Sequence, residues 1–138
     1  VRYTTDIVFG LDTSTIECKS EKKVVFSIID LSKRKNLEKY TKQYNKFMID
    51  IINYFINKDY NVTLMSFCEG EGDVDAIEYI YSRCTKSKKI SIYKYEGNIN
   101  DSINVLSTAE YIIATRFHAM ILGFLLKKKV LLQMKVLQ

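Results

Sequence analysis

Short apolar runs rich in β-branched residues alternate with segments of helical periodicity along this chain. Residues 23–30 (KVVFSIID) form such a run, and residues 36–56 follow with apolar side chains every three or four positions. The first pattern is typical of a strand covered on both faces, and the second is typical of an amphipathic helix. Strands that alternate with helices predict a parallel sheet, because parallel neighbours need a long crossover connection.

The same alternation continues toward the C-terminus. We expect further strands at residues 62–68, 89–95, 110–114 and 130–134, and further helices at residues 74–84, 101–108 and 116–126. The predicted fold class is therefore α/β, a Rossmann-like doubly wound parallel sheet with right-handed crossovers, in which strand 89–95 lies nearer an edge. Residues 1–20 are interpreted as a strand or linker from a preceding domain, and residues 21–138 as the Rossmann-like domain.

Composition narrows the possible partners. The formal net charge is +5, but the lysines are mixed with Asp and Glu, and no signature of a nucleic-acid module is present. No apolar run reaches the roughly 18 residues that a membrane span needs. The three cysteines are widely spaced and form no metal-binding pattern, so we expect no metal and a reducing, cytoplasmic location. We expect no nucleic-acid partner and no membrane span.

Ligands of doubly wound sheets bind beyond the carboxyl ends of the strands. The segment from Thr115 to His118 lies at such a position, where a strand ends and a helix begins. Free backbone N–H groups and the positive end of the helix dipole favour an anion there. Arg116 adds a planar fork suited to phosphate or carboxylate, and His118 is the only histidine of the chain. The competing interpretation is that Arg116 caps a carbonyl and that His118 is a partly buried, hydrogen-bonded residue.

Two further loops at the same edge carry candidate residues. In the acidic segment 68–73 (CEGEGD), Glu69 and Asp73 suit sugar hydroxyls, although Asp73 is also expected as a helix N-cap. Gly97 and Asn98 follow the strand nearer the edge, where backbone amides could face a ligand. A tight turn with a positive φ at Gly97 explains the same residues.

The loop after the first strand offers Arg34 as a second anion contact. Its neighbours Lys33 and Lys35 equally favour a solvated basic loop without a ligand.

Several segments together resemble the polysaccharide pyruvyl transferase family. They read VVFSIIDL, LMSFCEGEGDVDAI, YEGNINDSINVLSTAEYIIATRFHAMILGFLL and KKKVLLQM, and they cover the chain from about residue 6 to the end. The block from Ala114 to Leu125, a strand followed by RFHA and an apolar helix, is the most specific element. The resemblance implies one half of a GT-B glycosyltransferase fold, namely the C-terminal half.

The resemblance also implies an activity. Members transfer a pyruvyl group from phosphoenolpyruvate to a sugar hydroxyl of a cell-surface or exopolysaccharide unit, with phosphoenolpyruvate as donor substrate and no cofactor. Arg116 and His118 then take part in donor binding and acid chemistry. Thr115, Glu69, Asp73, Gly97 and Asn98 are the further candidates for substrate binding. The N-terminal domain of the parent chain supplies the other wall of the cleft, so this chain is expected to be incomplete alone.

Two departures from the family pattern affect these expectations. Lys127, Lys128 and Lys129 stand where the family commonly has glycine, lysine and proline, which alters a turn. Ile29 or Asp30 stands where an arginine is common, so one anion contact is in question. The alternatives are half of a GT-B-like nucleotide-sugar glycosyltransferase, or a non-catalytic Rossmann-like interaction module.

Overall fold

The structure is a computed structural model that describes residues 20–67, 72–115 and 117–132. Its sheet has five strands, β1 (Lys23–Ser27), β2 (Asn61–Met65), β3 (Ile90–Tyr93), β4 (Tyr111–Ala114) and β5 (Lys129–Leu132). The connecting helices are α1 (Thr41–Asn57), α2 (Asp73–Arg83), α3 (Ile99–Ser107) and α4 (Phe117–Leu125), and two 3₁₀ turns, η2 (Leu31–Lys33) and η3 (Glu38–Tyr40), precede α1. The predicted α/β class with a parallel sheet is confirmed, since every strand pairing is parallel.

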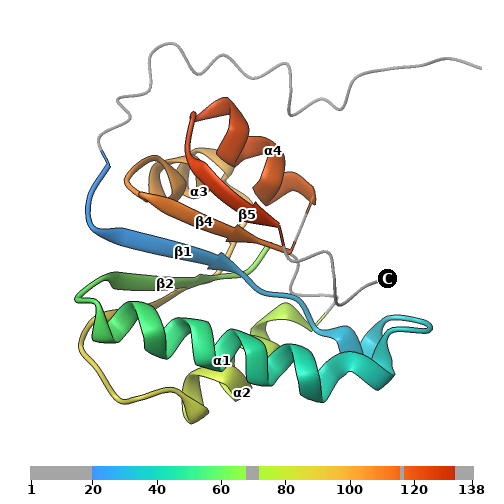
Figure 1. Cartoon of the computed structure of the whole chain (residues 1–138). Coiled ribbons are helices and arrows are strands. Elements are labelled where there is room, and N and C mark those ends of the chain that lie inside the picture. Colours follow the sequence, from blue (N-terminus) through green and yellow to red (C-terminus); the bar gives the residue numbers. More distant parts are fainter. Residues whose placement is uncertain (1–19, 68–71, 116, 133–138) are drawn as a thin grey trace, which may run out of the picture.

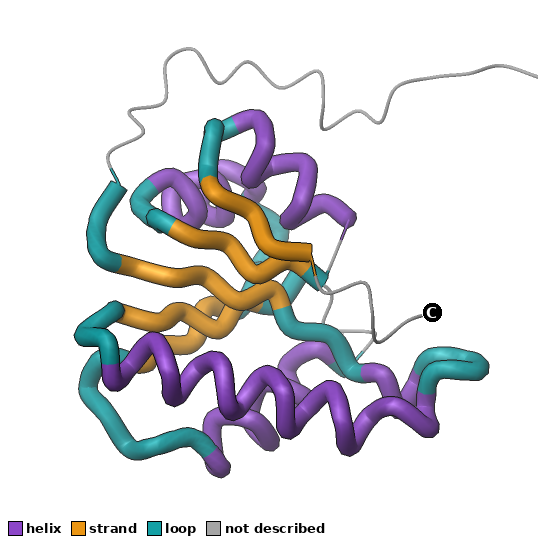
Figure 2. Tube along the Cα trace, viewed as in Figure 1, coloured by secondary structure: helices purple, strands orange, loops and turns teal. Residues whose placement is uncertain are grey.

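The sheet lies between two helical layers, α1 and α2 on one face and α3 and α4 on the other (Figures 1 and 2). Alternate residues of β1 divide between two cores. Val24 and Phe26 belong to the cluster packed against α1 and α2, and Val25 belongs to the cluster packed against α3 and α4. All three side chains are fully buried, which explains why this strand reads as an uninterrupted apolar run.

The strand order is β3-β2-β1-β4-β5, so the chain moves outward from β1 to β3 and then returns to place β4 on the other side of β1. This reversal creates a topological switch point between β1 and β4, where doubly wound proteins bind ligands. Ser27 and Ala114 are register partners, and each is the last residue of its strand. The two strands therefore end at the same level of the sheet.

The strands are shorter than or slightly shifted from the predicted ranges, and two helices begin at clearly different residues. The helix expected from residue 36 begins only at Thr41, because Asn36 has a φ of 67° that no right-handed helix accommodates, and η3 follows it. The helix expected from residue 101 begins earlier, at Ile99. The position of β3 at the edge confirms the prediction for strand 89–95. The assignment of residues 1–20 to a preceding domain lies outside the described residues, apart from Ser20.

Candidate functional site

A chain of hydrogen bonds joins the ends of β1, β4 and α1 at the switch point. The Ile29 N–H donates to the Tyr44 hydroxyl at 3.3 Å, and the Tyr44 hydroxyl donates to Thr115 Oγ1 at 3.4 Å. Thr115 Oγ1 in turn donates to the backbone carbonyl oxygen of Ser27. We call these four residues the switch-point network. Because hydroxyl groups can donate and accept at once, the network fixes the first residue after β4 from two sides.

Thr115 is a member of this network, and the other predicted candidates of the segment, Arg116 and His118, come directly after it in the chain. Thr115 is half-buried at the end of β4, and α4 begins two residues later with its backbone N–H groups. The His118 side chain is exposed in the first turn of α4. Arg116 lies outside the described residues. The structure thus brings Thr115 and His118 to the carboxyl edge of the sheet, where the sequence predicts an anion site.

The acidic segment gives a different result from the prediction. Asp73 is not the N-cap of α2: it is the first helical residue, and Gly72 in the left-handed conformation precedes it as the cap. The Asp73 side chain is fully buried, and its Oδ2 accepts from the Phe67 N–H at 3.4 Å. The N-cap prediction is therefore wrong, because the carboxylate turns inward to the end of β2. Glu69 lies outside the described residues.

Because Gly72 has no side chain, the loop before α2 can lie close to the loop after β1. A Cβ atom at Gly72 would lie 2.8 Å from Asp30 Oδ2 and 2.8 Å from Lys33 Nζ. Its φ of 83° adds a second requirement for glycine, since side chains rarely adopt this conformation. The loop that leads into α2 is thus packed against the loop that follows β1.

Gly97 and Asn98 form the turn between β3 and α3. Gly97 has a φ of 92°, which confirms the predicted positive φ. The Asn98 side chain accepts from the Asn100 N–H at 3.0 Å and caps α3, a role that the sequence analysis did not assign. Because β2 and β1 separate β3 from β4, the axes of β3 and β4 lie roughly 14 Å apart at the usual spacing of strands. The strand order therefore does not bring these two residues next to Thr115.

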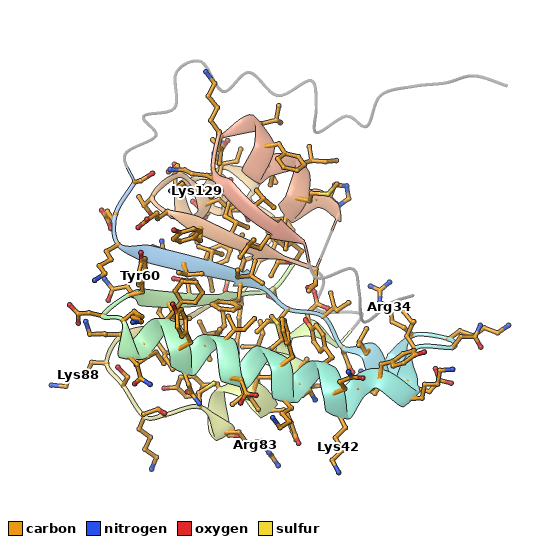
Figure 3. The ribbon with its side chains drawn as sticks, in the orientation of Figure 1. Arg34, Lys42, Tyr60, Arg83, Lys88 and Lys129 are labelled. Atoms are coloured by element: carbon orange, nitrogen blue, oxygen red, sulfur yellow. The ribbon has the colours of Figure 1, made fainter. Side chains whose placement is uncertain are left out.

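The loop after β1 carries Asp30 and Arg34. Asp30 Oδ1 accepts from the Ser32 N–H at 2.9 Å and caps η2. Figure 3 shows Arg34 on the side of the sheet where the strands end, whereas Tyr60 and Lys129 lie on the opposite side. Arg34 therefore lies at the same end of the molecule as the switch-point network.

Two residues of the site region have no role assigned from the sequence. Tyr44 is one of the side chains of the helical repeat at residues 36–56, and nothing in the local pattern distinguishes a hydrogen-bonding role of its hydroxyl from a plain aromatic contact. Ser27 offered a signal, because it is a polar residue within the apolar run of β1. It is fully buried, and its hydroxyl has no hydrogen-bond partner among the residues that the structure describes.

Comparison with protein families indicates the class of reaction, which the geometry alone does not define. A family model described as polysaccharide pyruvyl transferase matches residues 1–132. The chain belongs to the polysaccharide pyruvyl transferase family. No curated protein and no solved structure matches the chain significantly. As a member of this family the chain is a transferase domain with a saccharide acceptor. Within the described ranges, no helix has the length and apolar character needed to cross a bilayer.

For a polysaccharide pyruvyl transferase domain, the switch-point network provides a rigid support for the start of α4. Tyr44 is 1% exposed and Ser27 is 0% exposed, so solvent does not compete for their hydrogen bonds. The Thr115 hydroxyl is held between the two, directly before the helix that carries His118. A helix start fixed in this way can present its N–H groups to an anion without reorganisation.

Proposed function

We propose that this chain is the donor-binding domain of an enzyme that transfers a pyruvyl group from phosphoenolpyruvate to a saccharide of a cell-surface or exopolysaccharide unit. The observation that carries the proposal is the anchored start of α4: Thr115 is bonded to Ser27 and Tyr44, and His118 is exposed one turn beyond. Family membership supports a reaction of the transferase class. We propose further that the reaction takes place in the cytoplasm and that the donor is a substrate, with no cofactor involved.

The chemistry of the donor suits such a site. Phosphoenolpyruvate carries a phosphate and a carboxylate, and the N-terminus of a helix is a ready site for either group. Arg116, whose role rests on its sequence position alone, would pair with one of the two anions through its planar fork. The exposed His118 would face the reacting part of the same molecule.

Ketal formation consumes two hydroxyl groups of one sugar. The first hydroxyl adds to C2 of the donor while C3 gains a proton, and the second hydroxyl then displaces phosphate from C2. One hydroxyl proton replaces the proton that the acid gave to C3, and the other leaves with phosphate. In this proposal His118 supplies the proton to C3, and the start of α4 stabilises the charge on the departing phosphate.

The saccharide would reach the donor from the open carboxyl edge of the sheet. The N-terminal domain of the parent chain is proposed to form the opposite wall of that cleft, and Glu69, Asp73, Gly97 and Asn98 remain proposed contacts of the substrates. Asp73 is the weakest of these, because its carboxylate is buried.

Isothermal titration with phosphoenolpyruvate tests the proposal. The full-length protein should bind phosphoenolpyruvate, and Arg116→Ala should abolish binding, whereas Arg83→Ala should bind as the wild type does. Arg83 is a suitable control because it is an exposed cation at the end of α2, stacked on Tyr79 with 3.6 Å between the guanidinium carbon and the ring centroid.

Two outcomes would overturn the proposal. Binding of a sugar nucleotide in place of phosphoenolpyruvate would favour the glycosyltransferase alternative. Absence of binding, combined with full function of the Arg116→Ala and His118→Ala variants in the parent protein, would favour an interaction module.

A further inference from the structure

Ser27 is an exception among the buried hydroxyl groups of the sheet. It ends the central strand β1, its side chain is 0% exposed, and its hydroxyl has no hydrogen-bond partner within the described ranges. Buried polar groups in native proteins are nearly always hydrogen-bonded, so each exception needs an explanation. Ser66 and Ser102 illustrate the usual case, since both are buried and both are bonded.

The bonds of these two serines show what Ser27 lacks. Ser66 Oγ accepts from the Tyr95 N–H at 3.3 Å, and Ser102 Oγ lies 3.4 Å from the Tyr93 hydroxyl oxygen. The first pair joins the residues that follow β2 and β3, and the second joins the end of β3 to α3, so both lie on the β2–β3 side of the sheet. The unpaired hydroxyl is therefore specific to the central strand at the switch point.

Strand alternation places the Ser27 side chain on the face covered by α3 and α4. Its register partners on either side are Met65 and Ala114, and both belong to the core cluster of that face. Ala119, in the first half of α4, belongs to the same cluster and is fully buried. These neighbours are apolar, so they provide no hydrogen-bond partner for the hydroxyl. The hydroxyl lies next to the segment that leads into α4.

Two independent features thus meet at one place. The nine-residue helix α4 directs its N-terminal N–H groups to the carboxyl edge of the sheet, and an unpaired donor lies at the end of the adjacent strand. Because Ser27 is the last residue of β1, its hydroxyl is at the level from which a ligand enters such a crevice.

We propose that the Ser27 hydroxyl donates a hydrogen bond to the anionic group of the donor that the start of α4 holds. The inference rests on the proposed function, because it assigns one more contact to the same donor site. A hydroxyl is well suited to this role, since it forms a short, charge-assisted bond to a phosphate or carboxylate oxygen. Ser27 acts in binding and takes no proton in the reaction.

The Ser27→Ala variant of the full-length protein separates this role from a structural one. Without ligand, the variant should melt at the wild-type temperature or above it, since no partner loses a bond. Its affinity for phosphoenolpyruvate, measured by isothermal titration, should fall by about tenfold or more, the usual worth of a hydrogen bond to a charged group.

Thr63→Val is the matched control. Thr63 lies on the same face of the sheet, as the register partner of Val25, and its hydroxyl oxygen is 3.1 Å from Ser91 Oγ. This variant should keep the wild-type affinity, and its melting temperature should change little, because Ser91 is exposed and can bond water in place of Thr63.

The outcomes of the titration distinguish the two levels of the proposal. If the wild type binds phosphoenolpyruvate and Ser27→Ala binds it equally well, the contact is refuted while the proposed function stands. A lower melting temperature of Ser27→Ala without ligand would also overturn the inference, because it would reveal a partner within the protein. If the wild type does not bind phosphoenolpyruvate, the proposed function fails first.

Discussion

The Tyr44 hydroxyl oxygen lies 3.4 Å from Oγ1 of Thr115, although the two residues are 71 positions apart in the chain. Tyr44 comes from α1, on one face of the sheet, and Thr115 precedes α4, on the other. Their bond passes through the switch point, where the ends of β1 and β4 lie side by side. The contact thus links the two helical layers at the edge where the donor is proposed to bind.

Replacement of Tyr44 by Phe tests the importance of this link. The variant keeps the ring in the core, but the Ile29 N–H loses its acceptor, and Thr115 Oγ1 keeps only its bond to the Ser27 carbonyl oxygen. Because the Ile29 N–H is buried, we expect the free energy of unfolding to fall by about 1–3 kcal/mol, measured by urea denaturation. Tyr54→Phe is the control on the same helix, since Tyr54 is 56% exposed. An equal loss in both variants would contradict the role of the hydroxyl.

Thr115 should respond to the loss of its hydroxyl more than to the loss of its methyl group. Thr115→Val removes the donor to the Ser27 carbonyl, so α4 loses its fixed starting point. We expect kcat/KM for pyruvyl transfer to fall by roughly tenfold to a hundredfold, because misplacement of a binding group costs that much. Thr115→Ser should retain most of the activity, and equal activity of the Val and Ser variants would refute the prediction.

His118→Ala should lower activity far more than stability. The side chain is exposed in the first turn of α4, so its removal creates no cavity. If His118 supplies the proton to the donor, kcat should fall by roughly 10²–10⁴-fold, the usual contribution of a positioned acid. Phosphate release reports the rate, and circular dichroism reports the fold.

Phe124→Ala serves as the control for His118, because Phe124 is 52% exposed further along α4. It should leave kcat unchanged. Wild-type turnover by His118→Ala would exclude the acid role.

Gly72 and Gly97 allow backbone strain and steric overlap to be separated. Both have a positive φ, but a Cβ at Gly72 would overlap Asp30 and Lys33, whereas nothing lies within 4 Å of one at Gly97. We expect Gly97→Ala to lower the free energy of unfolding by about 1 kcal/mol through strain alone. Gly72→Ala should cost more, about 2 kcal/mol, because the Asp30 and Lys33 side chains must also move away from the new Cβ. Thermal or urea denaturation measures both, and equal losses would contradict the packing of these loops.

The Cys84 thiol makes the free energy of unfolding depend on pH in the alkaline range. Burial raises the pKa of its thiol from the ordinary 9.0 to about 11. Above pH 9 the unfolded chain therefore loses the proton while the folded chain retains it, so this group destabilises the fold as the pH rises toward 11. The wild type should lose more free energy of unfolding between about pH 8 and pH 10 than Cys84→Ala does. Parallel pH profiles of the two proteins would show that the thiol is not shielded.

The sequence predicts the sheet well because its signals are local. The apolar run of β1 follows from burial on both faces, and the repeat within α1 follows from burial of one side, so each is visible in a few consecutive residues. The position of Thr115 and His118 at the carboxyl edge is predictable for the same reason. The predicted N-cap of α2, Asp73, was wrong because Gly72 and Asp73 are both acceptable at a helix start. Only contacts with residues elsewhere in the chain decide between them.

The sequence by itself determined the fold class, the family and the location of the segment from Thr115 to His118. Only the tertiary structure decided that Tyr44 and Ser27 belong to the same region, and that Gly97 and Asn98 lie apart from it. Periodicity records whether a side chain is buried, but not which distant atom its hydroxyl meets. That partner depends on strand order and register, which here bring Ser27 beside Ala114 and Tyr44 within reach of Thr115.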